Sequence, residues 1–430
     1  MLSENINRNA SGTLTFADQN VAELAEKYSA PLYLMDEQRI RDNIRMYKNA
    51  LSAAFGDNYK VLLASKAASF KQIYRIAASE GIGSDVVSCG EIYTASAAGF
   101  PMDKVYFHGN AKTDADIAYA IEHGVGCFVV DNYEELEAVN MLAGKAGIKQ
   151  RVILRVTPGI DPHTYDAIST GKVDSKFGVA IETGQAKPFV IAAAAKENID
   201  LRGIHCHVGS QVFEEDVYER TADIMIGFMK EIRRETGIEL TELNLGGGYG
   251  VRYLETQAKA DIGARIAALA VHIKALCERL NFPVPTIIME PGRSIVADAG
   301  MTVYAVSSIK RIKGYKSYVA VDGGMTDNPR YALYEAPYTV LDVQDRGEKE
   351  FFDLVGRCCE SGDIIQPAVG LNADMKRGDL VAVCTTGAYN YSMASNYNRV
   401  PRLPIIMLMN GESYVAVRRE SFEDVAALDV

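Results

Sequence analysis

Apolar and polar residues follow a regular order between about residues 59 and 290. Short apolar runs rich in β-branched residues recur eight times, and amphipathic stretches of helical length separate them. The runs are YKVLLA, GSDVV, KVYFHG, CFVVD, RVILRV, LRGIHCHV, LNLGGG and TIIMEPGR. Alternating strands and helices are typical of βα units around a parallel sheet. Eight such units favour an α/β fold of the (β/α)8 TIM-barrel type over an open doubly wound sheet.

The stretches between these runs predict helices on the outside of the barrel. Their apolar residues recur at intervals of three and four, as on one face of an α-helix. The helices are predicted, among others, at residues 70–79, 91–98, 114–122, 133–143, 216–234 and 262–280.

After Glu290 the pattern changes to strands joined by turns. The segments are IVADAGMTVYAVSSIKR, KSYVAVDGG, YTVLDVQ, EKEFFDLVGRCC, DLVAVCTTGAY and SYVAVRRES. They predict an all-β domain, a sandwich or barrel. The early PLYLMD segment can pair with this domain or close the bottom of the barrel, and we assign it to the β-domain. The expected domains are therefore a barrel over residues 36–285 and a β-domain over residues 1–35 and 286–430.

Composition narrows the class of function. The chain has 430 residues, 48% hydrophobic and 23% charged, which is typical of a globular protein. Its net charge of −11 and the absence of a basic run argue against nucleic-acid binding. The apolar runs are too short to span a membrane. Seven cysteines without a CxxC pair, after an N-terminus that lacks a signal-peptide pattern, predict a cytoplasmic protein with reduced thiols. Small-molecule chemistry is the expected function.

Polar residues or glycines stand at or just after the end of each of the eight apolar runs. In a barrel these ends meet at one mouth, where active sites form. Strands also tend to end where polar residues begin, whether or not a site is present. No single one of these positions therefore indicates an active site on its own. The eight residues are Lys66, Asp85, His108, Asp131, Arg155, His207, Gly247 and Glu290.

Lys66 is a single lysine between an apolar strand and a helix. At a barrel mouth, partial burial can lower the pKa of a lysine so that its amine attacks an aldehyde. The alternative is a surface lysine whose aliphatic part packs on the protein.

Two further motifs follow the sixth and seventh runs. In HCHVGSQ, His205 and His207 lie on the same face of a strand, so a metal pair is conceivable, but no third ligand stands at a suggestive spacing. We therefore expect no metal, and an imidazole here can instead stack on a planar ring. LGGGYG, which contains Gly247 and Gly248, is either a phosphate-binding loop or a plain tight turn.

EPGRS places Glu290 and Arg293 around a Pro-Gly turn at the end of the eighth run. The two can form a surface ion pair. A carboxylate opposite a pyridine nitrogen would instead keep that nitrogen protonated. An amine, a stacking imidazole, a phosphate loop and this carboxylate together indicate pyridoxal 5'-phosphate as the cofactor.

As an ordered set, ASKA, DSKFGV, HCHVGSQ, LNLGGGYG, EPGRS, CCESGD and GAYNYSMASNYN resemble the barrel-fold pyridoxal-phosphate decarboxylases, to which alanine racemase is a distant relative. The resemblance covers nearly the whole chain. With Arg330 and Tyr334, the last motif is most similar to the diaminopimelate decarboxylases. The resemblance implies a carboxy-lyase of lysine biosynthesis that converts meso-2,6-diaminopimelate to L-lysine and CO2.

The family also implies a role for each matched residue. Lys66 binds the cofactor as a Schiff base, His207 stacks on its ring, and Glu290 pairs with its nitrogen. The phosphate is held by Ser210, Gly247, Gly248 and the backbone near Gly292, with Asp85 and Arg155 close by. The residues implied to contact the substrate are Arg293, Arg330, Tyr334, Glu360 and Tyr389, of which Arg293 and Tyr389 also lie at the cofactor.

Cys358 and Cys359 in RCCESGD are ambiguous on their own, because free cysteine is commonly a buried packing residue. Along a strand the two side chains would point to opposite faces. The resemblance implies that Cys359 protonates the substrate carbon and is delivered to the barrel mouth of the other subunit. A homodimer with shared active sites follows.

Other interpretations stay open at this point. A decarboxylase of the same fold for ornithine, arginine or carboxynorspermidine differs only in substrate, and a non-catalytic relative would bind without turnover. A sugar-phosphate barrel enzyme that uses Lys66 would leave the β-domain unexplained. The sequence departs from the family pattern at Ala68 and Ala111, which bears on fine geometry rather than on the reaction.

Overall fold

The protein divides into two compact units. The computed structural model describes residues 2–160 and 174–430. We call Ile44–Gly250 with Ala260–Ser294 the barrel unit, and Met1–Asn43 with Val251–Lys259 and Ile295–Val430 the β unit. The division falls inside α2 (Glu37–Phe55) and again inside α10 (Arg293–Val296).

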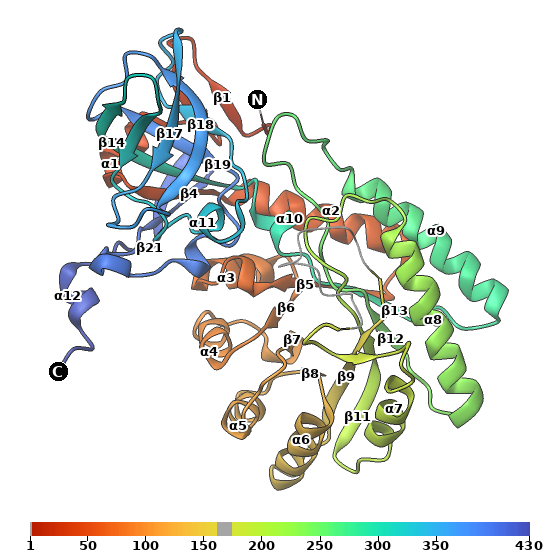
Figure 1. Ribbon diagram of the computed structural model, residues 1–430. Helices are drawn as coiled ribbons and strands as arrows, with labels where there is room; N and C mark the ends of the chain where they lie inside the picture. The colour runs from red at the N-terminus through yellow and green to blue at the C-terminus, as the bar shows by residue number, and fades with distance from the viewer. Residues whose placement is uncertain (1, 161–173) are drawn as a thin grey trace. The chain divides into compact units, whose positions relative to one another are not determined.

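A closed parallel barrel forms the centre of the barrel unit, as predicted (Figure 1). Strand pairing runs from β5 around to β13, which pairs with β5 again and so closes the ring. The expected boundary at residue 285 thus falls just before the eighth strand. The strands are β5 (Tyr59–Ala64), β6 (Gly83–Val86), β7 (Val105–Phe107), β8 (Cys127–Val130), β9 (Gln150–Thr157), β11 (Ile199–His205), β12 (Glu242–Asn244) and β13 (Thr286–Met289), and the short β10 (Val179–Ala180) extends the sheet at β9.

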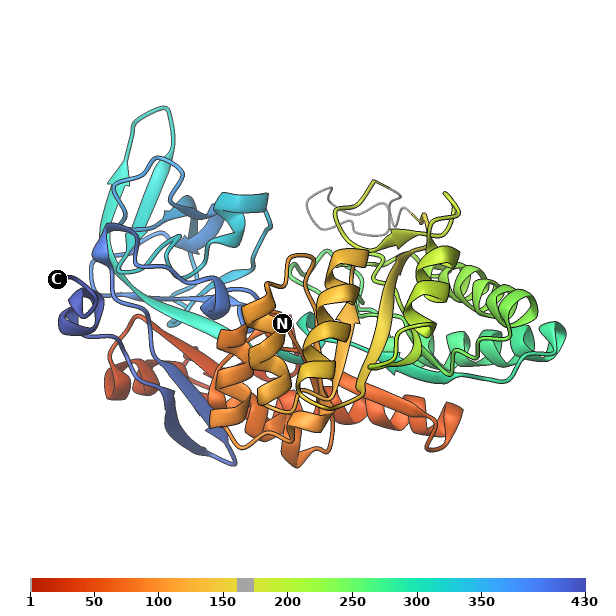
Figure 2. The same cartoon turned by 90° about the horizontal axis from the view of Figure 1, so that it is seen from below.

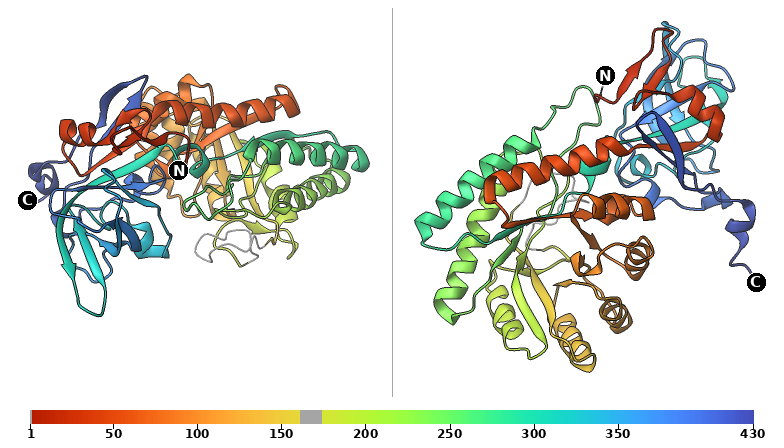
Figure 3. Two further views of the ribbon diagram at one scale, coloured as in Figure 1. Left: turned by 90° about the horizontal axis from the view of Figure 1, so that it is seen from above. Right: turned by 180° about the vertical axis from the view of Figure 1, so that it is seen from behind.

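Helices cover the outside of this barrel. Neighbouring helices from α3 to α6 contact each other in turn and form a row in Figure 2, and α8 packs along α9 (Figure 3). Local sequence fixes several of the starts: Thr113 and Asp116 form a capping box at α5, and Asn132 caps α6. The helices are α3 (Lys71–Ser79), α4 (Cys89–Ala97), α5 (Asp114–Glu122), α6 (Tyr133–Lys145), α7 (Ala186–Ala194), α8 (Val217–Thr236) and α9 (Ile262–Leu280).

Side chains fill the interior of the barrel. Leu62, Tyr106, Cys127, Val129, Ile153 and Ile288 form one buried cluster. Burial of each large side chain contributes about 1.5–3 kcal/mol. The strands are therefore held firmly, and the residues at their carboxyl ends are carried on a rigid support.

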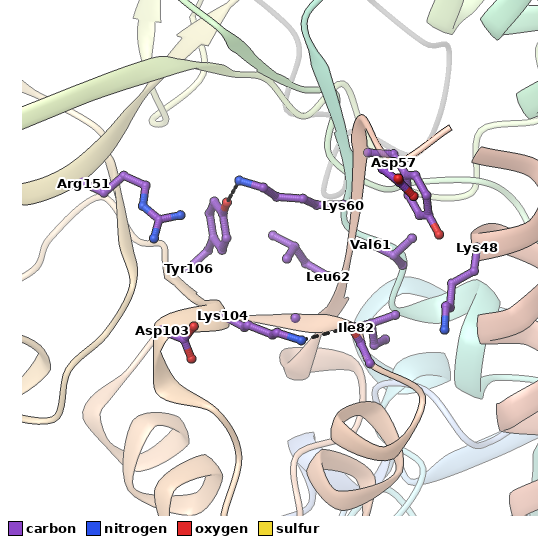
Figure 4. A pocket seen from close by; sticks show the side chains of 13 residues that line it. Lys48, Asp57, Lys60, Val61, Leu62, Ile82, Asp103, Lys104, Tyr106 and Arg151 are labelled. Atoms are coloured by element: carbon purple, nitrogen blue, oxygen red, sulfur yellow. Dashed lines mark hydrogen bonds between the residues drawn. The ribbon is translucent and has the colours of Figure 1, made fainter. Parts of the chain in front are cut away.

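A cavity of about 400 Å³ opens at the amino-terminal ends of β5 to β7 (Figure 4). Lys60 lies in it and donates to Tyr106 Oη at 3.0 Å and to Glu242 Oε1 at 2.8 Å. Lys66 follows the other end of β5, so this cavity is separate from the predicted catalytic mouth.

One large sheet dominates the β unit. The order is β18-β17-β15-β14-β4-β20-β21, and β19 joins β14 to β16. The early strand β4 pairs with β14 and with β20, so its assignment to the β-domain is confirmed. The strands are β4 (Leu32–Asp36), β14 (Gly300–Arg311), β15 (Ser317–Val321), β16 (Val340–Asp342), β17 (Lys349–Val355), β18 (Ile364–Asn372), β19 (Leu380–Cys384), β20 (Ile405–Met409) and β21 (Glu412–Val417).

Smaller elements complete the β unit. A three-stranded sheet packs its apolar residues, including Leu14 and Phe16, into the same core as β4. These elements are β1 (Ile6–Arg8), β2 (Leu14–Phe16), β3 (Gln19–Asn20), α1 (Val21–Tyr28), α11 (Arg330–Tyr334) and α12 (Phe422–Ala426). Within the described ranges, no helix has the length and apolar character that crossing a bilayer requires.

Candidate active site

The predicted site residues fall into two groups, one in each unit. The barrel group lies near or just after the carboxyl ends of the strands and comprises Lys66, Asp85, Arg155, His207, Ser210, Gly247, Gly248, Glu290, Gly292 and Arg293. The second group lies in the β unit and comprises Arg330, Tyr334, Cys359, Glu360 and Tyr389.

Glu290 is the centre of a buried hydrogen-bond network in the barrel unit. Its Oε1 lies 2.8 Å from His108 Nε2 and 2.7 Å from Asn244 Nδ2, and its Oε2 lies 3.2 Å from His205 Nε2. All four side chains are buried. Sequence reasoning selected Glu290 but gave no role to His108 at the cofactor and overlooked Asn244. His108 is polar at the end of an apolar run, which was its only signal, whereas Asn244 lies within such a run and gave none.

Electrostatics in this network favour an ionised glutamate beside neutral imidazoles. Burial alone would raise the pKa of Glu290, but His108 and His205 outweigh it and hold that pKa well below its usual value. Burial lowers the pKa of His205 to about 4 and lowers that of His108 as well. Each imidazole therefore donates its Nε2–H to the carboxylate.

His108, His205 and Glu290 also lie close enough to coordinate a metal ion, with ligand atoms within 4.8 Å of one another. The sequence pointed instead to His205 with His207, and His207 does not belong to this group. The His108–Glu290 and Asn244–Glu290 distances are those of hydrogen bonds, and Asn244 shares an oxygen with His108. The geometry thus corresponds to a hydrogen-bond network rather than to a metal-binding site.

Lys66 and Asp85 stand at the ends of neighbouring strands. Lys66 lies in a 3-10 turn directly after β5 and is exposed, whereas Asp85 in β6 is buried. Burial, and next the charge of Glu290, raise the pKa of Asp85, and the charge of Lys66 opposes this. Asp85 Oδ1 has no hydrogen-bond partner within the described residues. A cationic or N–H-bearing ligand would satisfy this buried oxygen.

The loops after β11, β12 and β13 pack closely against one another. A Cβ on Gly247 would lie 2.2 Å from the Glu290 carbonyl oxygen, and one on Gly248 would lie 2.2 Å from the Gly209 carbonyl oxygen. Gly248 also has a φ of +115°, which side chains rarely allow. Close loop packing by itself therefore requires these glycines.

Arg293 and Ser210 join two of these loops. Nε and Nη2 of Arg293 lie 3.2 and 3.0 Å from Ser210 Oγ. The first turn after β13 is equally tight, since a Cβ on Gly292 would lie 2.8 Å from Ala64 Cβ. A hydroxyl, a guanidinium and glycine-rich backbone thus meet at the ends of β11 to β13, and this donor set suits a phosphate.

The DSKFGV segment is held against the ends of β8 and β9. The Arg155 guanidinium lies 4.2 Å from the centre of the Phe177 ring, and Asp131 Oδ1 accepts a hydrogen bond from the Gly178 N–H at 3.0 Å. Arg155 is buried. Its contact with Phe177, together with the Asp131–Gly178 bond, fixes this segment of the mouth.

In the β unit, Arg330 is buried among aromatic side chains. Its guanidinium lies 4.7 Å from the Tyr253 ring centre, and Nη1 donates to Tyr338 Oη at 3.0 Å. Tyr338 in turn donates to Asn390 Oδ1 at 3.1 Å, and Asn390 directly follows Tyr389. The segments that carry Arg330 and Tyr389 are therefore linked. Tyr334 ends α11, four residues after Arg330.

The strand predicted through Cys358 and Cys359 is wrong, because β17 ends at Val355. The chain turns away where the Asp363 carboxylate accepts the backbone N–H of Cys358 at 2.7 Å. Cys359 lies on this loop, is exposed, and donates its N–H to Asn398 Oδ1 at 2.8 Å. Cys358 is only partly exposed. The two thiols still differ in environment, for a reason other than strand alternation.

Asp327 is the acidic residue closest in sequence to Arg330 on its N-terminal side. It is fully buried, and its Oδ2 accepts the Gly324 N–H at 3.0 Å. Burial raises the pKa of Asp327 to about 7. Its carboxyl group thus folds back onto its own loop.

The barrel group fits pyridoxal phosphate on its own chemistry. Lys66 offers an amine, Glu290 a buried and ionised carboxylate, and Asp85 a buried oxygen without a partner among the described residues. Ser210, Arg293 and the glycine-rich backbone supply donors for a phosphate.

Comparisons with known proteins agree with this chemistry. The profile of the family described as pyridoxal-dependent decarboxylase, pyridoxal binding domain, matches residues 37–297. Diaminopimelate decarboxylase of Bacillus subtilis (strain 168) is 42% identical over 98% of this chain and 96% of its own length. That of Staphylococcus aureus (strain COL) is 39% identical over 98% of each chain.

A solved structure is similar over the whole length. Diaminopimelate decarboxylase from M. jannaschii in complex with L-lysine has a TM-score of 0.92 and 33% identity, covering 100% of this chain and 99% of that one. The chain belongs to the pyridoxal-dependent decarboxylases, and among them to the diaminopimelate decarboxylase family.

Proposed function

We propose that this protein decarboxylates meso-2,6-diaminopimelate to L-lysine and CO2 with pyridoxal phosphate as its cofactor. The observation that carries the proposal is the buried Glu290, kept ionised by its network with His108 and His205. A buried carboxylate needs a cationic partner, and a protonated ring nitrogen is one. When bound, pyridoxal phosphate supplies a ring that accepts the electrons left behind by the departing carboxylate.

The cofactor roles proposed for the barrel unit are those that the family resemblance implies, and the chemistry of the residues supports them. The Lys66 amine would bind the cofactor covalently, and the His207 imidazole would stack on its ring. Glu290 would accept the ring N–H. The phosphate is bound by Ser210 and Arg293 and by the backbone at Gly247, Gly248 and Gly292, and Asp85 and Arg155 complete the surroundings.

The proposed substrate roles follow from charge. Diaminopimelate carries a carboxylate and an ammonium at its distal end. Arg330, already oriented by Tyr253 and Tyr338, can bind that carboxylate through two parallel hydrogen bonds, and Glu360 can accept the ammonium. Arg293, Tyr334 and Tyr389 are proposed to make the other substrate contacts.

Cys359 is proposed to donate the proton to the substrate carbon, because it is exposed on the loop after β17. A positioned thiol can act as a general acid in such a step. In the proposed homodimer, this loop of the β unit serves the barrel mouth of the partner. The β unit is thus proposed to contribute active-site residues across the dimer.

A cytoplasmic location is also proposed. All seven cysteines are unpaired. Reduced thiols are the usual state in that compartment.

A decarboxylase for ornithine, arginine or carboxynorspermidine is the competing function. Ornithine has no distal carboxylate, so a pocket for it would gain nothing from Arg330. Asp327, the nearby acid that would suit a simple diamine, is buried and bonded to Gly324. Both features favour diaminopimelate.

The deciding experiment supplies the protein with pyridoxal phosphate and, separately, meso-diaminopimelate, ornithine or arginine, and measures CO2 and L-lysine. We expect CO2 and L-lysine from diaminopimelate alone. In Lys66→Ala, the visible absorbance of the bound cofactor and turnover should both disappear while the circular dichroism spectrum stays unchanged. Faster CO2 release from ornithine, or turnover by the Lys66→Ala variant, would reject the proposal.

A further inference from the structure

The network around Glu290 uses one residue from each of four barrel strands or their ends. His108 follows β7, His205 ends β11, Asn244 ends β12 and Glu290 follows β13. The two imidazole rings meet edge to face, with centres 4.9 Å apart and planes at 74°. The carboxylate is therefore approached from three strands at once.

Backbone bonds fix the orientation of this network. Asn244 Oδ1 accepts the Gly246 N–H at 2.8 Å, so its amide nitrogen has to face Glu290. The Glu290 N–H donates to the Gly246 carbonyl oxygen at 2.8 Å, and the His108 N–H donates to the Val86 carbonyl oxygen at 2.8 Å. The donors and the acceptor are thus held by the strands that carry them.

The lone pairs of Glu290 are unequally occupied. Among the described residues, Oε1 receives two donors, from His108 and Asn244, whereas Oε2 receives one, from His205. A carboxylate oxygen has two lone-pair positions. One position on Oε2 therefore stays available for a further donor.

His205 has a feature that a purely structural residue would not need. Its Nδ1 is buried and has no hydrogen-bond partner in the part of the chain that the structure describes. A buried acceptor without a partner costs free energy, which an apolar side chain of similar size would avoid. What the imidazole provides, and an apolar side chain could not, is the hydrogen bond from Nε2 to Glu290.

We propose that His108 and His205 are positioning residues, neutral imidazoles whose Nε2–H groups keep Glu290 ionised and direct the open lone pair of Oε2 to the ring N–H of the cofactor. The inference rests on the proposed function. By this inference, the two histidines control, through Glu290, whether the ring nitrogen carries a proton. Glu290 could not keep that nitrogen protonated by itself in a buried site.

The test compares leucine and glutamine at each position. Leucine removes the donor, whereas the amide nitrogen of glutamine can take the place of Nε2. The intact enzyme is loaded with pyridoxal phosphate labelled with 15N in the ring, and the 15N chemical shift reports whether that nitrogen carries a proton. His108→Leu and His205→Leu should move the shift toward the unprotonated value and lower kcat at least tenfold, with little change in KM. His108→Gln and His205→Gln should restore most of both.

His272→Leu is the matched control, because His272 lies on the surface of α9 and bonds to Asp223. It should leave the shift and kcat unchanged. If a leucine variant does not fold, asparagine replaces leucine, since its amide is too short to reach Glu290. An unchanged ring-nitrogen shift in folded donor-free variants would overturn the inference, even with reduced turnover. Failure of the unmodified protein to bind the cofactor would overturn the proposed function instead.

Discussion

The side-chain carboxylate of Asp363 accepts a hydrogen bond from the backbone N–H of Cys358 at 2.7 Å. Its other oxygen accepts the Met325 N–H at 2.6 Å. Gly324 and Gly356 flank this carboxylate so closely that a Cβ would lie 2.6 Å and 2.3 Å from it. One buried acid thereby joins the loop that carries Cys359 to the segment that leads to Arg330.

Removal of this carboxylate should affect both stability and turnover. Asp363→Ala leaves two partly buried amides without an acceptor, which costs about 1–3 kcal/mol in the free energy of unfolding. Because the loop is released, we also expect kcat to fall at least tenfold. Denaturant unfolding and initial rates measure the two effects. Asp374→Ala is the control: this exposed acid pairs with Arg346, and its loss should leave stability and rate close to those of the unmodified protein. Wild-type stability and rate in Asp363→Ala would contradict the prediction.

The two adjacent cysteines should respond differently to substitution. Cys359→Ala should lower kcat by about 100-fold or more, the usual range for loss of a general acid, while cofactor absorbance remains. Cys358→Ala should mainly lower the melting temperature. Absorbance spectra, steady-state rates and thermal melts separate these effects, and equal losses of kcat would count against the assignment.

Chemical labelling offers a second test of the same pair. Partial burial and the neighbouring Asp363 raise the pKa of Cys358 to about 12, so its thiol stays protonated at pH 8. Cys359 is exposed. Iodoacetamide should therefore modify Cys359 first, as peptide mapping by mass spectrometry would reveal. Preferential labelling of Cys358 would be the contrary result.

Arg330 should determine the preference for a substrate with a distal carboxylate. Arg330→Lys keeps the charge but loses the paired donors, so kcat/KM for diaminopimelate should fall about 10- to 100-fold, as expected for loss of a charge-assisted hydrogen bond. Binding of pyridoxal phosphate, measured by absorbance titration, should not change. Arg346→Lys, at an exposed site of the same unit, is the matched control. An unaltered kcat/KM would remove Arg330 from the substrate site.

Acid should destabilise the barrel unit partly through His205. Its pKa is lowered to about 4 by burial, whereas an imidazole in the unfolded chain has a pKa near 6.5. Between these values the unfolded state binds a proton that the folded state does not. Stability therefore falls as pH falls, by up to about 1.4 kcal/mol per pH unit from this group.

His205→Gln removes that titration. Between pH 6.5 and 4, its free energy of unfolding should depend less steeply on pH than that of the unmodified protein, with cofactor present in both. Denaturant titrations at several pH values measure the two slopes. Parallel slopes would show that His205 does not titrate on unfolding.

Periodicity predicted the barrel well but missed two strands in the large sheet of the β unit, β18 and β20. The run YKVLLA coincides with β5, and residues 114–122 and 262–280 coincide with α5 and α9. We did not predict β18, which contains Pro367 and has Ala368 at a φ of +53°. We also did not predict β20: its sequence IIMLM does not alternate between polar and apolar residues, because four of its five residues are buried.

The site could be predicted residue by residue but not contact by contact. A barrel pattern places His108 and Glu290 at one mouth, yet they lie 182 positions apart, and no local signal states that they bond. Asn244 stands inside an apolar run and gave no signal of its own. The loop at Cys358 ends its strand early because of a tertiary contact with Asp363, which periodicity does not contain.

The position of β4 has a consequence for how the protein is made. This strand leaves the ribosome before the barrel strands, and its partner β20 leaves after them. The barrel unit lies between them in sequence, so its strands can pair while the sheet of the β unit is still incomplete. Until β20 has been synthesised, the five residues of β4, all buried in the finished sheet, lack this neighbouring strand. A nascent chain that stops before residue 405 would therefore carry a finished barrel and an open, apolar strand edge, the kind of species that chaperones and proteases recognise.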